Sequence, residues 1–493
     1  MKAIIIMFDT LAKDFMPMYG NEWVHAPNFK KLSKKMITFN NFYGGSMPCM
    51  PARREMHTGK YNFMHRGWGP LEYFDFSVFE ELNKNGIYTH LVTDHSHYWE
   101  DGGGTYHNRY TTWDGFRGQE GDRWMPREFA NIVDNNNVLN KKGDSVVQHF
   151  ANRFQQIDES EFSTVKTINA GVEFIRKYNK KDNWLLQIEC FDPHEPFYVP
   201  EKYRKIYESV QIDNLPYFPK YTAVKTDEER SQISQMRKEY AALISMVDNH
   251  LGDLIDELEK NNMFEDTLII LNTDHGFLLG EHDWIGKNIM PMYDEIIHTP
   301  FMINVPNVRN IEKVDTISQT IDIAPTLLDF FNINCKRDID GKSLLKVIEK
   351  EVQKENEKSQ NILFGINGGH ICIYDGKYIY MRGSENEEKN KKLTVQTTTF
   401  TNMRGFFSIE ELKTIKQIPG NKYSDYLPIF EVQKSNYLRS DLLGNLLFDM
   451  ENDKKQMNPL KNPDIENEMI KKLIIEMEKY EAPQSEFERL GLK

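Results

Sequence analysis

The sequence predicts an α/β fold, with a large, mostly parallel sheet flanked by helices on both faces and a smaller C-terminal α+β subdomain with a short antiparallel sheet. Short runs rich in Ile, Leu and Val alternate with longer amphipathic segments, which is typical of a parallel sheet with crossover helices. The composition becomes more charged after residue 344, which indicates a separate C-terminal region. With 493 residues, the chain can bury a large core.

The clearest predicted strands all end in polar side chains. Ligands of open α/β sheets bind beyond the carboxyl ends of the strands, so these side chains are expected to meet at one edge. Any one aspartate there could be only a turn former. Four strands together, three with a histidine at or near the aspartate, favour a metal or acid–base site. The strands and their terminal residues are 3–8 with Asp9, 88–93 with Asp94, His95 and His97, 184–191 with Asp192 and His194, and 268–273 with Asp274 and His275.

A short helix is predicted in the stretch CMPARREMHTG, with Pro51 near its start and Gly59 at its end. Cys49 would lie at its N-terminus, where the helix dipole favours negative charge, so a lowered thiol pKa is expected. Arg53, one turn on, would add a cation on the same side. These features allow a cysteine nucleophile, but the aspartates argue for a divalent metal, and a thiolate is an unusual neighbour for hard carboxylate ligands.

Two longer segments follow. Residues 101–165 are polar and form a loop-rich insertion over the sheet edge, a kind of segment that often shapes a substrate pocket. Residues 226–261 predict a long helix with Thr226 as its cap and an apolar stripe that packs in the core.

The predicted division of the chain is a catalytic α/β domain over 1–358 and a C-terminal subdomain over 359–493. The stretch ICIYDGKYIYMRG predicts a hairpin turning at Asp375 and Gly376. Residues 464–480 predict a terminal helix.

The composition excludes several classes of partner. The net charge is −13 and no block of Lys or Arg stands out, so nucleic acid is not an expected partner. No secretory signal or membrane span is recognisable, and the four cysteines are not paired at metal or redox spacing. A cytoplasmic protein is expected. The oligomeric state is left open, and an oligomer is compatible with the sequence.

The stretch Cys49-Met50-Pro51-Ala52-Arg53, with Thr58-Gly59 at the right distance, resembles the signature of the sulfatase family in the alkaline-phosphatase superfamily. The resemblance covers nearly the whole chain, because further blocks follow in the family's order. They are NTDHGFLLGEHDWIGK (272–287), YDEIIHTPFMINVP, SQTIDIAPTLLDFFNI, DGKSL and LLFDMENDKKQMNPL (446–460).

The resemblance implies hydrolysis of a sulfate ester. In this family the cysteine is oxidised after translation to formylglycine, an aldehyde, so the resemblance also implies a formylglycine-generating maturation enzyme as a partner. One hydroxyl of the aldehyde hydrate attacks sulfur and forms a covalent sulfo-enzyme, and the second hydroxyl then expels sulfate. A serine or a thiol has no second hydroxyl for that step.

The resemblance assigns roles residue by residue. Asp9, Asp274 and His275 would bind a divalent metal, joined by modified Cys49. Arg53 would hold the formylglycine hydrate, and Lys287 and His194 would contact the sulfate and leaving group, with His194 as the proton donor. Asp94, His95, His97 and His298 are further substrate-binding candidates, although each histidine could equally be a packed residue.

Two departures from the family pattern affect the metal and the substrate. Many sulfatases have paired aspartates where this chain has Asp9-Thr10, and Asp-Asn where it has Asp274-His275. An added imidazole makes Mn²⁺ a competitor to Ca²⁺. The same pattern resembles the phosphonate monoester hydrolase branch, whose members are promiscuous between phosphate and sulfate esters.

Three functions therefore remain as hypotheses. The first is a sulfatase acting on a small sulfate ester, such as a sulfated sugar or an aryl sulfate. The second is a phosphonate monoester or phosphodiester hydrolase that uses the same site. The third, a catalytically silent binding protein, is disfavoured because Asp9, Arg53, Asp274, His275 and Lys287 are all retained.

Overall fold

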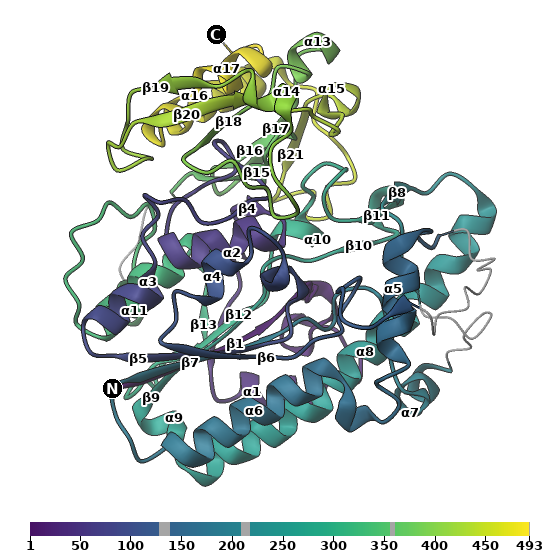
Figure 1. The fold of residues 1–493 in the computed structure, drawn as a ribbon, viewed down its shortest axis with the longest axis vertical. Coiled ribbons are helices and arrows are strands. Elements are labelled where there is room, and N and C mark those ends of the chain that lie inside the picture. The colour runs from purple at the N-terminus through teal and green to yellow at the C-terminus, as the bar shows by residue number, and fades with distance from the viewer. Residues whose placement is uncertain (128–138, 209–216, 355–359, 493) are drawn as a thin grey trace.

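An eight-stranded sheet forms the centre of the protein in the computed structural model, which describes residues 1–127, 139–208, 217–354 and 360–492 (Figure 1). The run β9–β1–β7–β5–β6 is parallel, whereas β12 is antiparallel to both of its neighbours. In sheet order the strands are β13 (Lys313–Val314), β2 (Ile37–Phe39), β12 (Phe301–Asn304), β9 (Thr267–Asn272), β1 (Lys2–Phe8), β7 (Trp184–Cys190), β5 (Tyr88–Thr93) and β6 (Thr112–Gly115).

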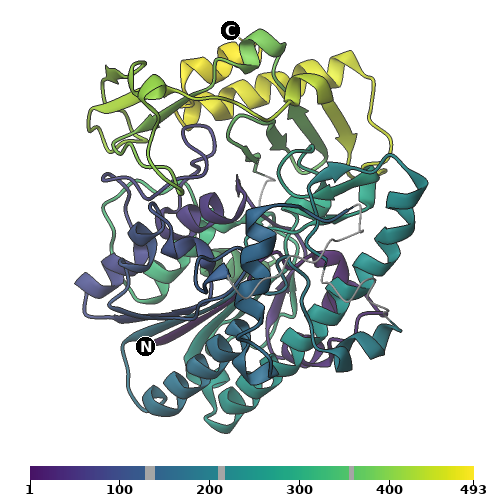
Figure 2. The same cartoon turned by 45° about the vertical axis from the view of Figure 1, so that its right-hand side comes forward.

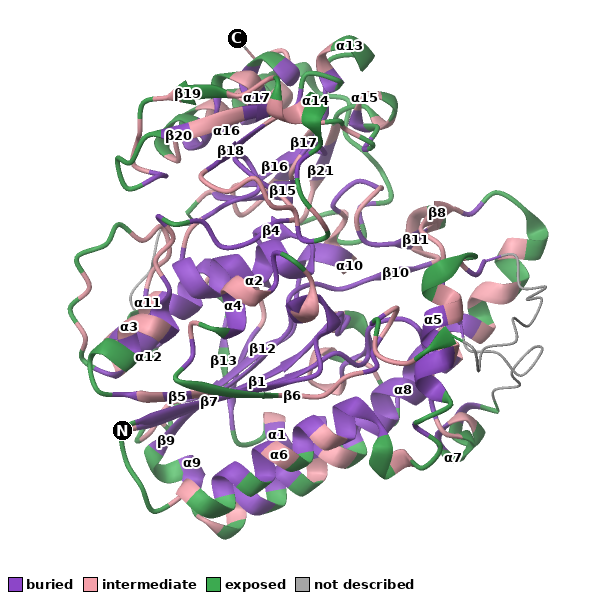
Figure 3. Cartoon of the chain, viewed as in Figure 1, coloured by how far each residue is buried: buried purple, intermediate pink, exposed green. Residues whose placement is uncertain are grey.

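Helices cover both faces of this sheet, as the sequence predicts. Successive side chains of a strand point to opposite faces, and all seven residues of β1 are buried. Ile4, Ile6 and Phe8 pack with helices α1 (Pro27–Ser33), α6 (Ser163–Tyr178) and α8 (Asp227–Lys260). Ala3, Ile5 and Met7 face α2 (Cys49–Thr58), α3 (Val78–Lys84), α11 (Ile323–Phe330) and α12 (Leu344–Gln353). Figure 3 shows the buried layer between the two sets of helices.

The long helix α8 begins at a capping box. The Thr226 hydroxyl accepts a hydrogen bond from the backbone N–H of Glu229, and the Glu229 carboxylate accepts one from the backbone N–H of Thr226. This reciprocal pair satisfies two donors that would otherwise lack partners at the helix start. The predicted bounds and cap of this helix are confirmed.

The predicted insertion contributes one strand to the main sheet. The short strand β6 pairs with β5 at the sheet edge, and three of its four residues are exposed, so its sequence lacks an apolar strand pattern. Helix α4 (Gly104–His107) precedes β6 and helix α5 (Asp144–Arg153) follows it, and residues 128–138 lie outside the described residues.

The C-terminal region forms a second layer above the sheet edge where the site lies (Figure 2). The predicted hairpin is present as β16 (Ile371–Tyr374) and β17 (Tyr378–Arg382), and Gly376 has a left-handed φ of 96° in its turn. The sheet order is β21 (Leu446–Asp449), β17, β16, β15 (Ile362–Ile366) and β4 (Ser46–Met47). Strand β4 immediately precedes α2, so this sheet is joined directly to the segment that carries Cys49. The predicted boundary at 358 falls outside the described residues.

Two further elements complete this region. A three-stranded sheet contains β18 (Thr394–Thr397), β20 (Ile429–Gln433) and β19 (Lys416–Ile418). Helix α16 (Pro463–Lys479) covers the hairpin, as expected from the sequence. Within the described residues, no helix is both long enough and apolar enough to cross a lipid bilayer.

Candidate active site

Four buried side chains from three segments meet at the carboxyl edge of the main sheet. Asp9 follows β1, Asp274 and His275 follow the adjacent strand β9, and Cys49 opens helix α2. One ligand atom from each of the four lies within 4.8 Å of all the others. The parallel pairing of β1 with β9 brings the two strand ends together, as the sequence argument requires.

His275 presents one ring nitrogen to this centre. Its Nδ1 lies 2.9 Å from the backbone carbonyl of Gly276, which can only accept, so Nδ1 carries the proton. Its Nε2 is then a lone-pair donor and lies 3.1 Å from the Cys49 Sγ. Burial lowers the pKa of His275 to about 4, so the ring is neutral at neutral pH. A neutral imidazole held by a backbone carbonyl is the form that binds metals.

The thiol of Cys49 departs from the sequence expectation. Burial raises its pKa well above the usual value, and the nearby Asp9 carboxylate raises it further. The positive charges of Lys287 and Arg53 lower the pKa of Cys49, but their effect is smaller than the combined effect of burial and the aspartates. The expectation of a lowered pKa at a helix N-terminus is wrong here, because desolvation of the fully enclosed thiol outweighs the helix dipole.

Arg53 lies behind Cys49 and contacts three carboxylates. Its guanidinium lies 2.9 Å from Asp9, 2.7 Å from Asp274 and 2.9 Å from Glu189. It also donates a hydrogen bond to the Cys49 carbonyl. Glu189 lies on β7 and has no exposed surface. The sequence analysis did not identify Glu189, although a glutamate in a fully buried strand run was a signal that could have revealed it.

The donor set fits a divalent cation. Burial raises the pKa of Asp9 well above the usual value, and the charge of Asp274 adds to this effect. Arg53 pairs with both carboxylates, but the pKa of Asp9 stays raised, so this cation does not offset the two enclosed charges and a further cation would stabilise them. Carboxylate oxygens with one imidazole suit Ca²⁺ or Mn²⁺.

Thr10 organises the site through three hydrogen bonds. Its hydroxyl donates to Asp9 at 2.6 Å and accepts from Lys287 Nζ at 3.1 Å, while its backbone N–H donates to Asp274 at 3.0 Å. Thr10 has φ +63°, which is unusual for a β-branched residue and is tolerated where function requires it. The sequence analysis treated Thr10 only as a departure from the family's paired aspartates.

Lys287 and His194 flank Cys49 from the other side. Both are linked by Glu195, whose Oε2 lies 3.6 Å from Lys287 Nζ and 3.3 Å from His194 Nδ1. Burial opposes ionisation of Glu195, but His194, Lys287 and Lys141 hold its pKa at about 2. His194 Nδ1 donates to the Glu195 carbonyl, which leaves Nε2 for another partner. Glu195 is a further residue that the sequence analysis did not single out.

The four remaining candidates lie in different places. His95 is fully buried with Nδ1 3.6 Å from Asp9, so it adjoins the centre. His97 lines the cavity described below and contacts Glu100 at 2.9 Å. Asp94 does not line that cavity, since it accepts hydrogen bonds from Gln119, Thr164 and the backbone N–H of Phe191. His298 also lies outside its lining and contacts Lys13, Asp294 and the Asn40 carbonyl.

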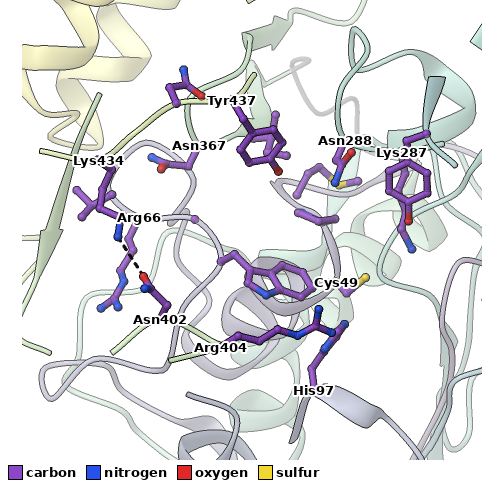
Figure 4. Close-up of a pocket in the computed structure, with 18 of the residues that line it drawn as sticks. Cys49, Arg66, His97, Lys287, Asn288, Asn367, Asn402, Arg404, Lys434 and Tyr437 are labelled. Carbon is purple, nitrogen blue, oxygen red and sulfur yellow. Dashed lines mark hydrogen bonds between the residues drawn. The ribbon is translucent and has the colours of Figure 1, made fainter. Parts of the chain in front are cut away.

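A cavity of about 400 Å³ opens from this centre toward the C-terminal region. Cys49, His194 and Lys287 line its inner end. Figure 4 shows Cys49 and Lys287 on one side of the cavity, with Lys434 and Asn402 on the opposite side. The lining drawn from the C-terminal region consists of Ile366, Asn367, Leu393, Val395, Asn402, Arg404, Phe407, Lys434, Ser435, Asn436 and Tyr437.

Comparison with known proteins agrees with this fold and identifies the family. The profile of the sulfatase family matches residues 2–333, about two thirds of the chain, and the chain belongs to that family. A choline-sulfatase from Rhizobium meliloti is 25% identical over 433 residues, covering 81% of this chain and 81% of its own. The protein is thus a sulfatase-family enzyme, and its relatives support hydrolysis of sulfate esters.

Two solved structures share the fold over nearly the whole chain. One is a protein in complex with its substrate D-glucosamine-2-N,6-O-disulfate, with a TM-score of 0.67, 16% identity and coverage of 98% of both chains. The other is a phosphonate monoester hydrolase of Agrobacterium radiobacter, with a TM-score of 0.65, 17% identity and coverage of 97% of this chain and 96% of that one. The predicted α/β architecture and family resemblance are confirmed.

Proposed function

We propose that the protein hydrolyses a small sulfate ester with a formylglycine hydrate derived from Cys49 and one divalent metal. The observation that carries the proposal is the meeting of Asp9, Cys49, Asp274 and His275 within 4.8 Å, with Arg53 bound to two of them.

Asp9, Asp274 and His275, together with modified position 49, would hold Ca²⁺ or Mn²⁺. When bound, the metal would polarise a sulfate oxygen and favour the ionised form of the attacking hydroxyl. Formation of the aldehyde needs a formylglycine-generating enzyme, which is therefore the expected maturation partner.

The surrounding side chains would act on the ester directly. Burial opposes the charge of Lys287, but Glu195, whose Oε2 lies 3.6 Å away, and the two aspartates act in the opposite direction, so it would be a cation able to bind a sulfate oxygen. Arg53 would fix position 49 through its backbone and hold the hydrate. Burial lowers the pKa of His194 well below its usual value, so in the free enzyme Nε2 carries a lone pair. His194 would first take up a proton at Nε2 and then deliver it to the leaving-group oxygen, and Glu195, 3.3 Å from Nδ1, would stabilise the imidazolium formed in between.

The second candidate is hydrolysis of a phosphonate monoester or a phosphodiester at the same site. His275 in place of the family's asparagine favours it, as does the shared fold with a phosphonate monoester hydrolase. Comparing kcat/KM on 4-nitrophenyl sulfate and bis(4-nitrophenyl) phosphate separates the two candidates. A clear preference for the phosphodiester would replace the first proposal by the second.

The nucleophile itself is tested by mass spectrometry of the peptide that contains Cys49, from protein made with a formylglycine-generating enzyme. We expect an aldehyde that a hydrazine reagent traps. Cys49→Ala should abolish turnover, whereas the matched control Cys372→Ala, in strand β16, should retain it. Unmodified Cys49 in protein that still cleaves esters would refute the diol mechanism.

A further inference from the structure

A second lysine lines the cavity near the groups that are proposed to act on the ester. Lys141 belongs to the insertion and shares the cavity lining with Lys287. Its backbone N–H donates to the Phe218 carbonyl at 2.8 Å, and the preceding Asn140 forms an antiparallel bridge with Pro219. The fold therefore fixes the point at which this lysine enters the cavity.

The ammonium group of Lys141 is held by two aromatic rings. Its Nζ lies 4.6 Å from the centroid of the Phe218 ring and 4.6 Å from that of the Tyr221 ring. An aromatic face attracts a cation through its quadrupole, but it has no net charge that could neutralise the cation. Among the residues that the structure describes, the carboxylate nearest to Lys141 is that of Glu195, 3.7 Å away and beyond hydrogen-bond distance. The ammonium has three N–H donors, and none of them makes a hydrogen bond to a described residue.

Glu195 cannot balance the charge of Lys141 by itself, because two lysines share it. Its Oε1 lies 3.7 Å from Lys141 Nζ, and its Oε2 lies 3.6 Å from Lys287 Nζ. The Tyr221 hydroxyl also donates a hydrogen bond to Glu195. One carboxylate carries one negative charge, so an anion beside the two ammonium groups is stabilised electrostatically.

The other carboxylates near this part of the cavity face other cations. Glu120 lines the cavity, and its Oε2 lies 3.8 Å from His97 Nε2 and 4.0 Å from Arg404 Nη2. The two aspartates of the proposed metal centre pair with Arg53. Within the described part of the chain, neither Glu120 nor these aspartates have a carboxylate oxygen within 4 Å of Lys141 Nζ. The positive charge of Lys141 is therefore open to an anionic group of the substrate.

The exposure of the two lysines places Lys141 further toward the cavity opening. The Lys287 side chain is 3% exposed and donates to the Thr10 hydroxyl beside the metal centre, whereas the Lys141 side chain is 26% exposed. An ester with its sulfur at position 49 must direct its leaving group toward the opening, because the buried metal centre closes the inner end. Lys141 thus lies on the leaving-group side of the ester.

We propose that Lys141 is a further catalytic residue, which contacts the leaving-group oxygen of the ester. This inference rests on the proposed sulfatase function and adds a residue to it. As the oxygen at position 49 bonds to sulfur, the bond between sulfur and the leaving-group oxygen breaks, and its electron pair passes to that oxygen. Lys141 remains an ammonium and stabilises this developing negative charge, while His194 supplies the proton.

The test removes the charge of Lys141 and keeps its shape. Lys141→Met retains an unbranched side chain over the two rings, and Lys141→Arg retains the charge. The matched control is Lys142→Met, because Lys142 is exposed and lies outside the cavity lining. We would measure kcat/KM on 4-nitrophenyl sulfate and on phenyl sulfate with aldehyde-bearing, metal-loaded enzyme. The nitro group spreads the negative charge of the leaving phenolate, so phenyl sulfate depends more on a cation at the leaving-group oxygen.

Lys141→Met should lower kcat/KM by about tenfold on 4-nitrophenyl sulfate and by about 10² on phenyl sulfate, which approaches the cost of removing one donor to a developing negative charge. Lys141→Arg should recover most of this loss, and Lys142→Met should match the wild type. Thermal unfolding checks that the variants are folded. A loss no larger than that of the control, or an equal loss on the two esters, would overturn the inference and leave the proposed function standing. A wild-type enzyme that cleaves neither sulfate would overturn both.

A double-mutant comparison separates direct contact from an effect that passes through Glu195 to His194. In enzyme that carries His194→Ala, Lys141→Met should still lower kcat/KM more on phenyl sulfate than on 4-nitrophenyl sulfate, because Lys141 acts on the ester itself. If Lys141→Met has no effect in this background, or lowers both rates equally, Lys141 acts by positioning His194 and the proposed contact is refuted.

Discussion

Replacement of Glu189 by glutamine tests whether this buried carboxylate holds Arg53 in place. Glu189 is fully buried, and its two oxygens accept hydrogen bonds from Arg53 at 2.9 Å, Tyr98 at 3.0 Å and Gln187 at 2.8 Å. Glutamine has one accepting oxygen, so its amide N–H₂ must face one of these donors. The substitution therefore removes a buried charge partner and also leaves donors unmatched.

The magnitude follows from the burial of the pair. Breaking a buried ion pair by removing one partner costs about 3–5 kcal/mol. Arg53 keeps Asp9 and Asp274 as partners, so we expect the lower end, a loss of about 3 kcal/mol in the free energy of unfolding. Urea denaturation of the metal-free protein measures this loss without a contribution from metal binding.

The control is Glu173→Gln, which removes a carboxylate from an exposed ion pair with Arg176. Solvent screens such a pair, so its stability should change little. If Glu189→Gln destabilises the protein no more than this control does, Arg53 does not depend on Glu189. Asp9 and Asp274 alone would then hold Arg53 in place.

Three further predictions concern the site and its surroundings. Lys287→Ala should lower kcat/KM on 4-nitrophenyl sulfate by about 10² or more, because a positioned charge on the sulfate is lost; a fall of less than about fivefold would contradict this role. Removal of metal by EDTA should lower the thermal unfolding midpoint, since a cation that binds only the folded state stabilises that state, and Ca²⁺ or Mn²⁺ should restore it; an unchanged midpoint would argue against a bound cation. Burial raises the pKa of Glu55 from 4.5 to about 8, so the native state holds a proton that the unfolded state releases, and stability should fall as pH rises from about 4.5 to 8. Glu55→Gln should remove this dependence and stabilise the protein more at pH 8 than at pH 5, as urea denaturation at the two pH values would show.

Local patterns were sufficient for much of the fold. The apolar runs before Asp9 and Asp274 identified strands of the main sheet, because a fully buried strand must be apolar on both faces. The long helix from Asp227 to Lys260 was predictable from its apolar stripe and its cap. Strand β6 could not be predicted from the sequence, because an exposed edge strand has no apolar run.

Some residues of the candidate site could be recognised from the sequence, and others only from the structure. The sequence alone determined the residue types, since Cys49 with Arg53 and the terminal aspartates of two strands can be recognised from their neighbours in the chain. Only the tertiary structure decided how these residues are held. Glu189, Thr10 and Glu195 act through contacts with residues distant in sequence, and no local pattern encodes such contacts.

The electrostatics of the site and the walls of the cavity also depend on the three-dimensional arrangement. A helix N-terminus predicts a lowered thiol pKa for Cys49, yet enclosure by the surrounding chain raises it. The fold also brings Lys434 beside Glu411 and Arg404 beside Glu100, and neither pair is adjacent in the sequence. Composition reports how many charges the chain has, whereas desolvation and pairing depend on which residues the fold brings within a few ångströms of one another.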